Sequence, residues 1–477
     1  MLFSGDGKLL AHAYAAYPMQ TPALDRCEQD AEDWWNALVT TARSVVREAH
    51  AEDRVAAISL SLQGGTLVPV DEQLRPLRPA SVWSDNRCTA EAEAFAARFG
   101  REYLYEKTGW NLGAGLNAMQ IAWIRENEPE VFRRTAMFLS VPDYISAKLT
   151  GRAACDISDA GINQLADIRL SKYDPAILDF AGVTERQLGE IVPSGAVIGK
   201  LTGEAKAALG LTGDVLLAAG AHDQYAALLG AGVLETGDVL IGTGTAWVVT
   251  ALTDRPNFDS GFAQSVSAVP GKWGSLVSLS TGGVCLDWLR GNVSVGADAG
   301  EKIPYAVLDA EAGKRAAGNV QFFPYFSGAS YPHKDARARA AFVGLDLSHD
   351  RYDMARAVME GVAFQTVWTL SAFDRQYGMG RVKMSGGATK SAVWTQIVAD
   401  IANRPVSIPA TPDLTCVGAA ILAGVGCGAF ASPAEGYAAL AVNERTVEPE
   451  RESAKRYAAL LPQFIERAKA LSLVYAH

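Results

Sequence analysis

Predicted strands and helices alternate along most of the chain. Val55–Leu62 is apolar and β-prone, and it follows a helical pattern that Asp30 caps and that extends to about His50. Further along, a strand pattern at Val382–Ser385 precedes a helical one at Ser391–Asn403. A chain that alternates in this way builds a sheet covered by helices, so the sequence predicts an α/β fold.

The length of the chain predicts two domains. Its 477 residues exceed the roughly 250 to 300 residues at which a single hydrophobic core stops growing. Thr236-Gly237-Asp238 is a turn motif between two apolar segments. We therefore place the boundary near residue 235, with an N-terminal domain of residues 1–234 and a C-terminal domain of residues 235–477.

The balance of charge favours a protein that acts on small molecules. Forty-three basic and 53 acidic residues give a net charge of −10, whereas a protein that binds nucleic acid needs a positive surface. Hydrophobic residues make up 49% of the chain and charged residues 20%, which excludes a disordered protein. We expect a globular protein that has no nucleic acid as a partner.

The sequence shows no pattern typical of export or of a membrane anchor. The first residues lack a charged leader followed by an apolar stretch, so we expect a cytoplasmic protein. Thr415–Pro433 carries no charge, but it is rich in Gly and Ala, which predicts a packed internal helix. The six cysteines are scattered singly and are expected to be reduced thiols, and the six histidines show no metal-ligand spacing.

A small-residue loop, Gly242-Thr243-Gly244-Thr245, interrupts two β-rich runs within residues 239–250. Small residues let backbone N–H groups converge on an anion, and threonine hydroxyls add donors, so the loop is a candidate phosphate site. A tight hairpin uses the same residue types, and both interpretations stay open at this point. The motif is not a Walker loop, because no GxxxxGK[ST] pattern occurs in the chain.

Asp223 is the most suggestive single residue. Residues 215–232 pass from a continuously apolar strand to an apolar helix, and Asp223 lies at the junction. A carboxylate in such an apolar setting is costly unless it has a catalytic role or a partner. Aspartate is also among the best residues for capping a helix N-terminus, so the two hypotheses carry equal weight on the residues alone.

Three further loops place polar groups at predicted strand ends, where α/β proteins bind their ligands. They are Gln63-Gly64-Gly65-Thr66, the segment Trp83–Arg87, and Ser385-Gly386-Gly387-Ala388. Ordinary turn chemistry is the alternative for each of them, and the residues alone favour it.

Taken in order, these motifs resemble the FGGY family of carbohydrate kinases over nearly the whole chain. The order and spacing of the motifs together carry the resemblance. They are Glu28-Gln29-Asp30 with Asp33-Trp34-Trp35, Trp83 with Asp85 and Arg87, Trp123-Ile124 with Glu126 to Pro129, Asp143-Tyr144 with Leu149-Thr150-Gly151, Gly242 to Thr245, Phe323-Pro324-Tyr325 with Ser327-Gly328, Gly344-Leu345, Glu360 to Phe364, and Ser385 to Ala388.

The resemblance implies two ribonuclease-H-like domains of the actin/hexokinase type, with ATP and a sugar meeting in the cleft between them. It implies that Asp223 is the catalytic base, and that ATP with Mg²⁺ is the phosphoryl donor. The positions that match the family's ATP-binding residues are Gly242, Thr243, Gly244, Thr245, Gly283, Gly386, Gly387, Ala388 and Ser391. Those that match its substrate-binding residues are Gln63, Gly64, Gly65, Trp83, Asp85, Asp223 and Gln224, and no residue is assigned to a protein-bound metal.

The sugar loop departs from the family patterns. It reads Gln-Gly-Gly-Thr, whereas xylulokinases usually have Gln-Met-His-Gly and glycerol kinases Gln-Arg-Glu-Thr. Glycerol is disfavoured, because Gly64 and Gly65 lack the side chains that hold it and Gly115 stands where a tyrosine would be expected. We expect a ketopentose such as xylulose, with ribulose, another ketose or a polyol as alternatives. The two glycines are expected to leave room for a larger or differently oriented sugar.

A second departure concerns the first residues. Family members begin with a strand that bears an Asp-x-Gly-Thr-Thr phosphate loop, upstream of the segment that Leu2-Phe3 resembles, and the present sequence contains no such strand. We expect either that the start codon has been placed too late or that the protein is a catalytically impaired relative that binds sugar or nucleotide. A small-molecule sugar is the expected partner, without a membrane, and a homodimer is left open.

Overall fold

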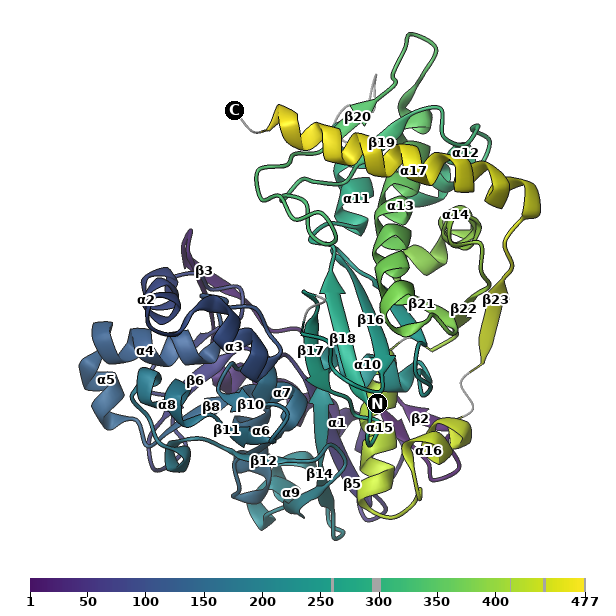
Figure 1. Cartoon of the computed structure of the whole chain (residues 1–477). Coiled ribbons are helices and arrows are strands. Elements are labelled where there is room, and N and C mark those ends of the chain that lie inside the picture. The colour runs from purple at the N-terminus through teal and green to yellow at the C-terminus, as the bar shows by residue number, and fades with distance from the viewer. Residues whose placement is uncertain (259–260, 294–301, 412, 441–442, 476–477) are drawn as a thin grey trace. The chain divides into compact units, whose positions relative to one another are not determined.

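The structure is a computed structural model of the chain, and it describes residues 1–258, 261–293, 302–411, 413–440 and 443–475. The chain forms two compact units (Figure 1). Unit 1 comprises Met1–Leu234, Asp254–Ser275 and Pro412–Val442, and unit 2 comprises Glu235–Thr253, Leu276–Thr411 and Asn443–His477. Two segments after residue 235 thus belong to the first unit, and the division into domains 1–234 and 235–477 stays a prediction.

Unit 1 contains a three-stranded sheet in the order β13-β14-β5. The strands are β13 (Val197–Lys200), β14 (Leu216–His222) and β5 (Ala57–Leu62), with β14 parallel to β5 and antiparallel to β13. A parallel pair needs a long crossover, and the chain between β5 and β14 supplies it. Helix α10 (Asp223–Gly230) follows β14 directly.

Helix α15 (Leu414–Gly426) packs closely against α10 within unit 1. A Cβ atom added to Gly418 would lie 2.0 Å from the Ala226 carbonyl oxygen, and one added to Gly230 would lie 1.9 Å from that of Leu414. Two helices approach this closely only through glycine. The predicted packed internal helix is confirmed, and no helix among the described residues is long and apolar enough to cross a membrane.

A second sheet of unit 1 has the order β3-β4-β7-β6-β8 and is antiparallel at each pairing. Trp34 of helix α1 (Ala31–Glu48) and Tyr144 of helix α6 (Val141–Thr150) pack into the same buried cluster as strand residues of both sheets. Asp30 caps α1 as predicted, since its side chain accepts a hydrogen bond from the Glu32 N–H.

The other elements of unit 1 are mostly short. They are β1 (Leu2–Phe3), β2 (Leu9–Ala11), β3 (Gln20–Ala23), β4 (Arg26–Gln29), β6 (Leu67–Val70), β7 (Ala80–Ser81), α2 (Thr89–Phe99), α3 (Arg101–Thr108), α4 (Asn117–Asn127), α5 (Pro129–Arg134), β8 (Met137–Ser140), β9 (Ala154–Asp156), α7 (Ile157–Ile162), β10 (Ala166–Asp167), β11 (Lys172–Tyr173), α8 (Pro175–Ala181), the 3₁₀ helix Glu185–Gln187, β12 (Glu190–Val192), α9 (Gly203–Leu209), β17 (Ala263–Val266) and α16 (Pro433–Ala439); β18 (Trp273–Ser278) crosses the boundary between the units.

Unit 2 contains strands in the order β16-β15-β21-β22-β23. Strands β15 (Val239–Thr243), β21 (Val382–Gly386) and β22 (Val406–Pro409) are parallel neighbours, while β16 (Trp247–Thr253) and β23 (Glu444–Val447) run antiparallel to theirs. These parallel strands, with α14 (Ala392–Ala402) after β21 and α15 after β22, confirm the predicted α/β class.

Helix α13 (Arg351–Tyr377) is buried over most of its length, and α14 (Ala392–Ala402) lies against it. The remaining elements of unit 2 are α11 (Gly283–Asn292), α12 (Tyr305–Ala312), β19 (Gln321–Phe323), β20 (Ala341–Val343), the 3₁₀ helix Gly387–Lys390 and α17 (Arg451–Val474). Strand β19 ends at Phe323, because the next residue is Pro324, which has no N–H to donate.

Candidate active site

Gln63 and Asp223 follow two strands of unit 1 that are direct neighbours. Strands β5 and β14 are parallel, and their register pairs Leu62 with His222. Gln63 directly follows β5, and Asp223 directly follows β14. The two residues therefore lie side by side at the carboxyl edge of the sheet, which is where open α/β sheets bind their ligands.

Asp223 is the first residue of α10, and His222 occupies the N-cap position. The hypothesis that Asp223 is the cap residue is therefore wrong. Its side chain is 41% exposed, and its Oδ1 atom lies 3.4 Å from Nδ1 of His222, which is buried. The carboxylate can thus be reached by a ligand. Gln224, the second residue of α10, is half-buried.

The Gln63 side chain is held in place by its neighbours. Its Nε2 atom donates to Gln29 Oε1 at 2.9 Å and to Thr66 Oγ1 at 3.1 Å. Gln29 is itself buried and accepts a second bond from Trp34 Nε1 at 3.1 Å. A residue that is fixed in this way can orient a ligand without a large loss of side-chain entropy.

Gly64 and Gly65 leave no open space. A Cβ atom on Gly64 would lie 2.4 Å from Ile162 Cγ2 and 2.7 Å from His222 Cδ2. A Cβ atom on Gly65, whose φ is +68°, would lie 2.5 Å from Leu116 Cδ2 and 3.1 Å from Trp83 Cβ. The expectation that the two glycines leave room for a larger sugar is therefore wrong, because side chains of the same unit fill that room.

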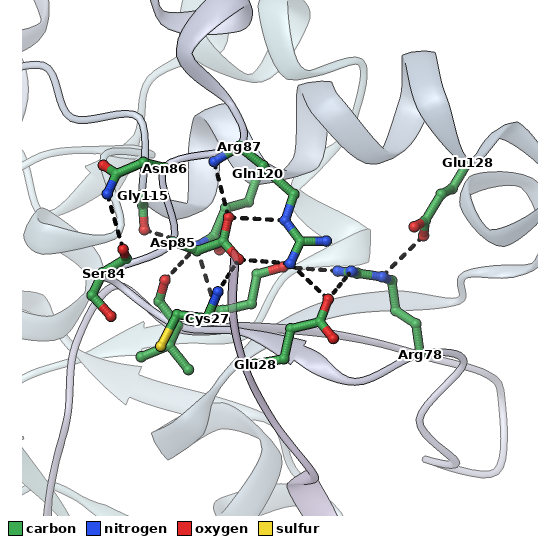
Figure 2. A network of polar contacts seen from close by, with 12 residues as sticks. Cys27, Glu28, Arg78, Ser84, Asp85, Asn86, Arg87, Gly115, Gln120 and Glu128 are labelled. Carbon is green, nitrogen blue, oxygen red and sulfur yellow. Dashed lines mark hydrogen bonds and ion pairs between the residues drawn. The ribbon is translucent and has the colours of Figure 1, made fainter. Parts of the chain in front are cut away.

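Asp85 is at the centre of a buried ionic network (Figure 2). Arg87 contacts both of its oxygens, Nε to Oδ1 at 2.8 Å and Nη2 to Oδ2 at 2.6 Å, and the Cys27 N–H donates to Oδ2 at 2.8 Å. Arg87 also binds Glu28, which in turn pairs with Arg78. The carboxylate of Asp85 thus holds its own loop together, and its predicted contact with substrate stays a prediction.

The same network presents Trp83 to solvent. Trp83 is 56% exposed, two residues before the buried Asp85. A Cβ atom on Gly115 would lie 2.2 Å from the Trp83 carbonyl oxygen and 2.6 Å from that of Asp85. Only glycine fits at position 115, because any side chain there would displace the backbone that carries Trp83. We call Gln63, Gly64, Gly65, Trp83, Asp223 and Gln224 the acceptor region.

In unit 2, the predicted phosphate loop is the turn of the β15–β16 hairpin. Thr243 pairs with Trp247, so Gly244, Thr245 and Ala246 connect the two strands. The hairpin hypothesis is thus correct, and it does not exclude anion binding. The Thr243 hydroxyl donates to the Ser385 carbonyl oxygen at 2.6 Å and accepts from the Ala388 N–H at 3.1 Å.

Other predicted nucleotide-binding residues gather around this turn. The Gly283 N–H donates to the Gly244 carbonyl oxygen at 3.1 Å, so the start of α11 meets the loop. A Cβ atom on Gly283 would lie 2.6 Å from that oxygen, and one on Gly386, whose φ is +96°, would lie 2.6 Å from the Thr243 oxygen. We call Gly242–Thr245, Gly283 and Gly386–Ala388 the nucleotide region.

Gly242 and Gly244 differ from those two glycines. A Cβ atom on Gly242 would come no closer than 3.7 Å to its nearest neighbour, and one on Gly244 no closer than 3.4 Å. Neither residue has a left-handed φ. The fold does not require glycine at these two positions, and their predicted contact with phosphate stays a prediction.

The Ser391 hydroxyl bonds to other groups of the protein. It accepts a hydrogen bond from the Trp394 N–H at 2.8 Å as the N-cap of α14, and it also contacts Asp309. Its predicted role in ATP binding stays a prediction. Within the described part of the chain, no three His, Cys, Asp or Glu side chains cluster as a metal site.

Comparison with known proteins identifies the family. The N-terminal domain of the FGGY family of carbohydrate kinases matches residues 1–230, and the C-terminal domain of the same family matches residues 239–427. The chain belongs to the FGGY family. It therefore has the two-domain, actin/hexokinase-like fold of these sugar kinases, as the sequence predicts.

Relatives with different substrates are about equally similar to this chain. The gluconokinase of Bacillus subtilis (strain 168) is 26% identical over 100% of this chain and 94% of its own length. The xylulose kinase of Escherichia coli (strain K12) is 27% identical over 97% of this chain and 94% of its own length. The structure of xylulose kinase from Rhodospirillum rubrum matches with a TM-score of 0.88 at 27% identity, over 96% of this chain and 93% of that one.

Two residues that shape the acceptor region, Asn163 and Ser158, were not found by the sequence analysis. Asn163 Oδ1 accepts from the Gly65 N–H at 3.1 Å, and Ser158 Oγ accepts from the His222 N–H at 3.0 Å. Both come from α7 or its end, a six-residue helix too short to show periodicity. The one available signal was Asp156, a good N-cap residue ahead of it.

Proposed function

We propose that the protein transfers the γ-phosphate of ATP to a hydroxyl of a neutral ketopentose such as D-xylulose, with Asp223 as general base. The observation that carries the proposal is the register of β5 and β14, which puts Gln63 and Asp223 side by side at one sheet edge. Family membership supplies the reaction class.

In the proposed reaction, the acceptor region holds the sugar. Asp223 takes the proton of the attacking hydroxyl as its oxygen bonds to the γ-phosphorus and the bond from that phosphorus to ADP breaks, so ADP leaves. The partial exposure of Asp223 makes the carboxylate accessible for this step. The Oε1 atom of the fixed Gln63 side chain accepts a hydrogen bond from a sugar hydroxyl, because both Nε2 protons are donated to Gln29 and Thr66. Trp83 supplies an apolar surface next to Gly65.

The nucleotide region holds ATP. Backbone N–H groups of Gly244, Thr245 and Gly387 lie against the phosphates, where glycine lets the backbone approach. Mg²⁺ bound with ATP supplies charge neutralisation on the phosphates.

The choice of Asp223 over Asp85 as general base rests on their partners. The Asp85 carboxylate is held by Arg87 within its own loop, whereas the Asp223 carboxylate is not bound in this way.

The composition of the acceptor region supports a neutral sugar. Gluconate carries a carboxylate, and sites that recognise carboxylates usually supply arginine or lysine. None of the six residues of the acceptor region is basic, and Asp223 is acidic. Gly115 also supports the proposal against glycerol, because a tyrosine at that position would collide with the backbone at Trp83.

The substrate is tested by measuring ADP release from ATP with D-xylulose, D-ribulose, gluconate and glycerol in turn, under identical conditions. The proposal expects the highest kcat/KM with a ketopentose. A higher kcat/KM with gluconate would contradict the neutral-sugar proposal. Binding of sugar and ATP without ADP release from any acceptor would contradict the kinase proposal and indicate a binding protein.

We also propose that the enzyme works in the cytoplasm. All six cysteines are free thiols and four of them are buried, which agrees with a reducing compartment. Localisation of a tagged protein in its native cells tests this proposal, and a protein found outside the cytoplasm would contradict it.

A further inference from the structure

The backbone that leads into Asp223 leaves the regular ladder. The register between β14 and β5 shifts between Ala218 and Ala221. A Cβ atom on Gly220 would lie 1.6 Å from the Leu60 carbonyl oxygen, so the two strands press together at this point. Irregularities of this kind re-aim the side chains that follow them, here His222 and Asp223.

A serine from another element pairs with the backbone at the end of this irregular stretch. The His222 N–H donates to Ser158 Oγ at 3.0 Å, and the Ser158 hydroxyl donates to Asp156 Oδ2 at 2.7 Å. A hydroxyl has one proton, so its donation to Asp156 turns the oxygen's lone pairs toward His222. His222, Ser158 and Asp156 are all at least 95% buried, so water does not readily replace this bond.

Asp156 is itself firmly held. As the N-cap of α7 it accepts from the Ser158 N–H at 2.9 Å, and it accepts from the Ser194 hydroxyl at 3.0 Å. At the other end of α7, Ile162 packs against Gly64, and Asn163 binds the Gly65 N–H. This one short helix therefore supports both the sugar loop and the turn that carries Asp223.

We propose that Ser158, oriented by Asp156, is a positioning residue for the reaction: it fixes the His222 backbone and thereby the direction of the Asp223 carboxylate. This inference rests on the proposed function of Asp223 as general base. A displacement of about 1 Å in a reacting group can lower turnover about 100-fold. Loss of the Ser158 hydroxyl should therefore lower kcat by roughly 10- to 100-fold, with little change in KM for ATP.

The test compares Ser158→Ala with Ser146→Ala. Ser146 is also a buried serine of unit 1, but its hydroxyl bonds the backbone of Ala154 at 2.9 Å. Both variants should lose similar thermal stability, while only Ser158→Ala should lose kcat. Ser158→Thr, which keeps a hydroxyl, should recover part of it. An equal loss of kcat in the two alanine variants would overturn the inference, since it would indicate a general effect of buried hydroxyls.

A double-mutant cycle separates positioning from other roles. If Ser158 acts through Asp223, Ser158→Ala should have no further effect on turnover in an Asp223→Asn protein. If Ser158→Ala lowered turnover by the same factor in the Asp223→Asn protein as in the native chain, the inference would be overturned. If Asp223→Asn itself leaves turnover unchanged, the proposed function of Asp223 fails instead, and the two failures are thus distinguished.

A second readout does not depend on activity. Hydrogen exchange followed by mass spectrometry over the peptide that contains His222 measures whether its N–H has lost its partner. Ser158→Ala should speed exchange in this peptide by at least about tenfold relative to Ser146→Ala. Unchanged exchange would overturn the inference even if the enzyme showed no turnover.

Discussion

Glycines of the nucleotide region fall into two groups by the space around them. Gly283 and Gly386 are required by neighbouring carbonyl oxygens, whereas Gly242 and Gly244 have room for a methyl group. The structure thus separates glycines that the fold needs from glycines that it does not need, and contact of the second group with phosphate stays a prediction.

Gly244→Ala should weaken ATP binding without weakening the fold. A methyl group at this exposed position would come no closer than 3.4 Å to the protein, but it would crowd phosphates bound against the backbone. We expect KM for ATP to rise about tenfold, or roughly 1.4 kcal/mol. Steady-state kinetics and thermal melting measure both effects. Gly283→Ala is the contrasting variant, because its melting temperature should fall.

The Asp85 carboxylate stabilises the loop that contains it. Its oxygens bind Arg87 and the Cys27 backbone in a buried setting. Asp85→Asn leaves the Arg87 charge without its bidentate partner and should reduce the unfolding free energy by about 3 to 5 kcal/mol. Urea unfolding measures this change.

A matched control for Asp85 is Asp179→Asn, which removes an ion pair with Arg98 in which both side chains are more than half exposed. This change should have little effect, because solvent screens such pairs. If Asp85→Asn unfolded at the same urea concentration as the native chain and only raised KM for the sugar, a substrate-binding role for Asp85 would replace the structural one.

At the scale of elements, the crossing of α10 and α15 depends on glycine. Alanine normally stabilises a helix relative to glycine by up to about 1 kcal/mol. Gly418→Ala should do the opposite and cost at least about 2 kcal/mol, because its Cβ would meet the Ala226 backbone at 2.0 Å. Gly203→Ala in α9, where nothing lies within 4 Å, should be neutral or stabilising. Thermal melting of both variants checks the opposite signs.

Helix α6 begins with a buried carboxyl whose titration should be visible in the stability of the protein. Burial raises the pKa of Asp143 to about 6, although hydrogen bonds from Ser140 act in the opposite direction. Between the ordinary value of 3.8 and about 6, the folded state binds more protons than the unfolded state. This group therefore lowers the unfolding free energy as pH rises through that range.

Asp143→Asn should remove this contribution. Asparagine cannot ionise, yet its amide oxygen can still accept the Ser140 N–H bond at the helix start. Unfolding free energies of both proteins, measured in urea at several pH values from 4 to 7, should diverge as pH rises, with the variant relatively more stable at pH 7. Parallel pH curves would show that Asp143 does not titrate in this range.

For the molecule as a whole, the sequence predicted what depends on local pattern. The alternation of strands and helices, the end of β14 at the Asp223 junction and the packed helix α15 all follow from runs of residue types. The prediction that Gly64 and Gly65 leave room for a larger sugar was wrong. Side chains from distant parts of the chain fill that space: Ile162, His222, Leu116 and Trp83. No local pattern reveals which distant side chain occupies such a space.

The same limit explains the positions that were missed. Helix α7 has six residues and no clear period, so Ser158 and Asn163 could not be tied to the acceptor region. The return of residues 254–275 and 412–442 to unit 1 is likewise a tertiary feature. Family resemblance supplied the reaction class, but relatives named for gluconate and for xylulose are about equally similar.

The most direct test of the proposed function is D-xylulose-dependent ADP release by the native chain and by Asp223→Asn at saturating ATP. The native chain should turn over. The variant should keep its melting temperature and its affinity for ATP while kcat falls by about 100-fold or more, the range expected for loss of a general base. Equal turnover by the two proteins would contradict the account, since Asp223 would then not be the base.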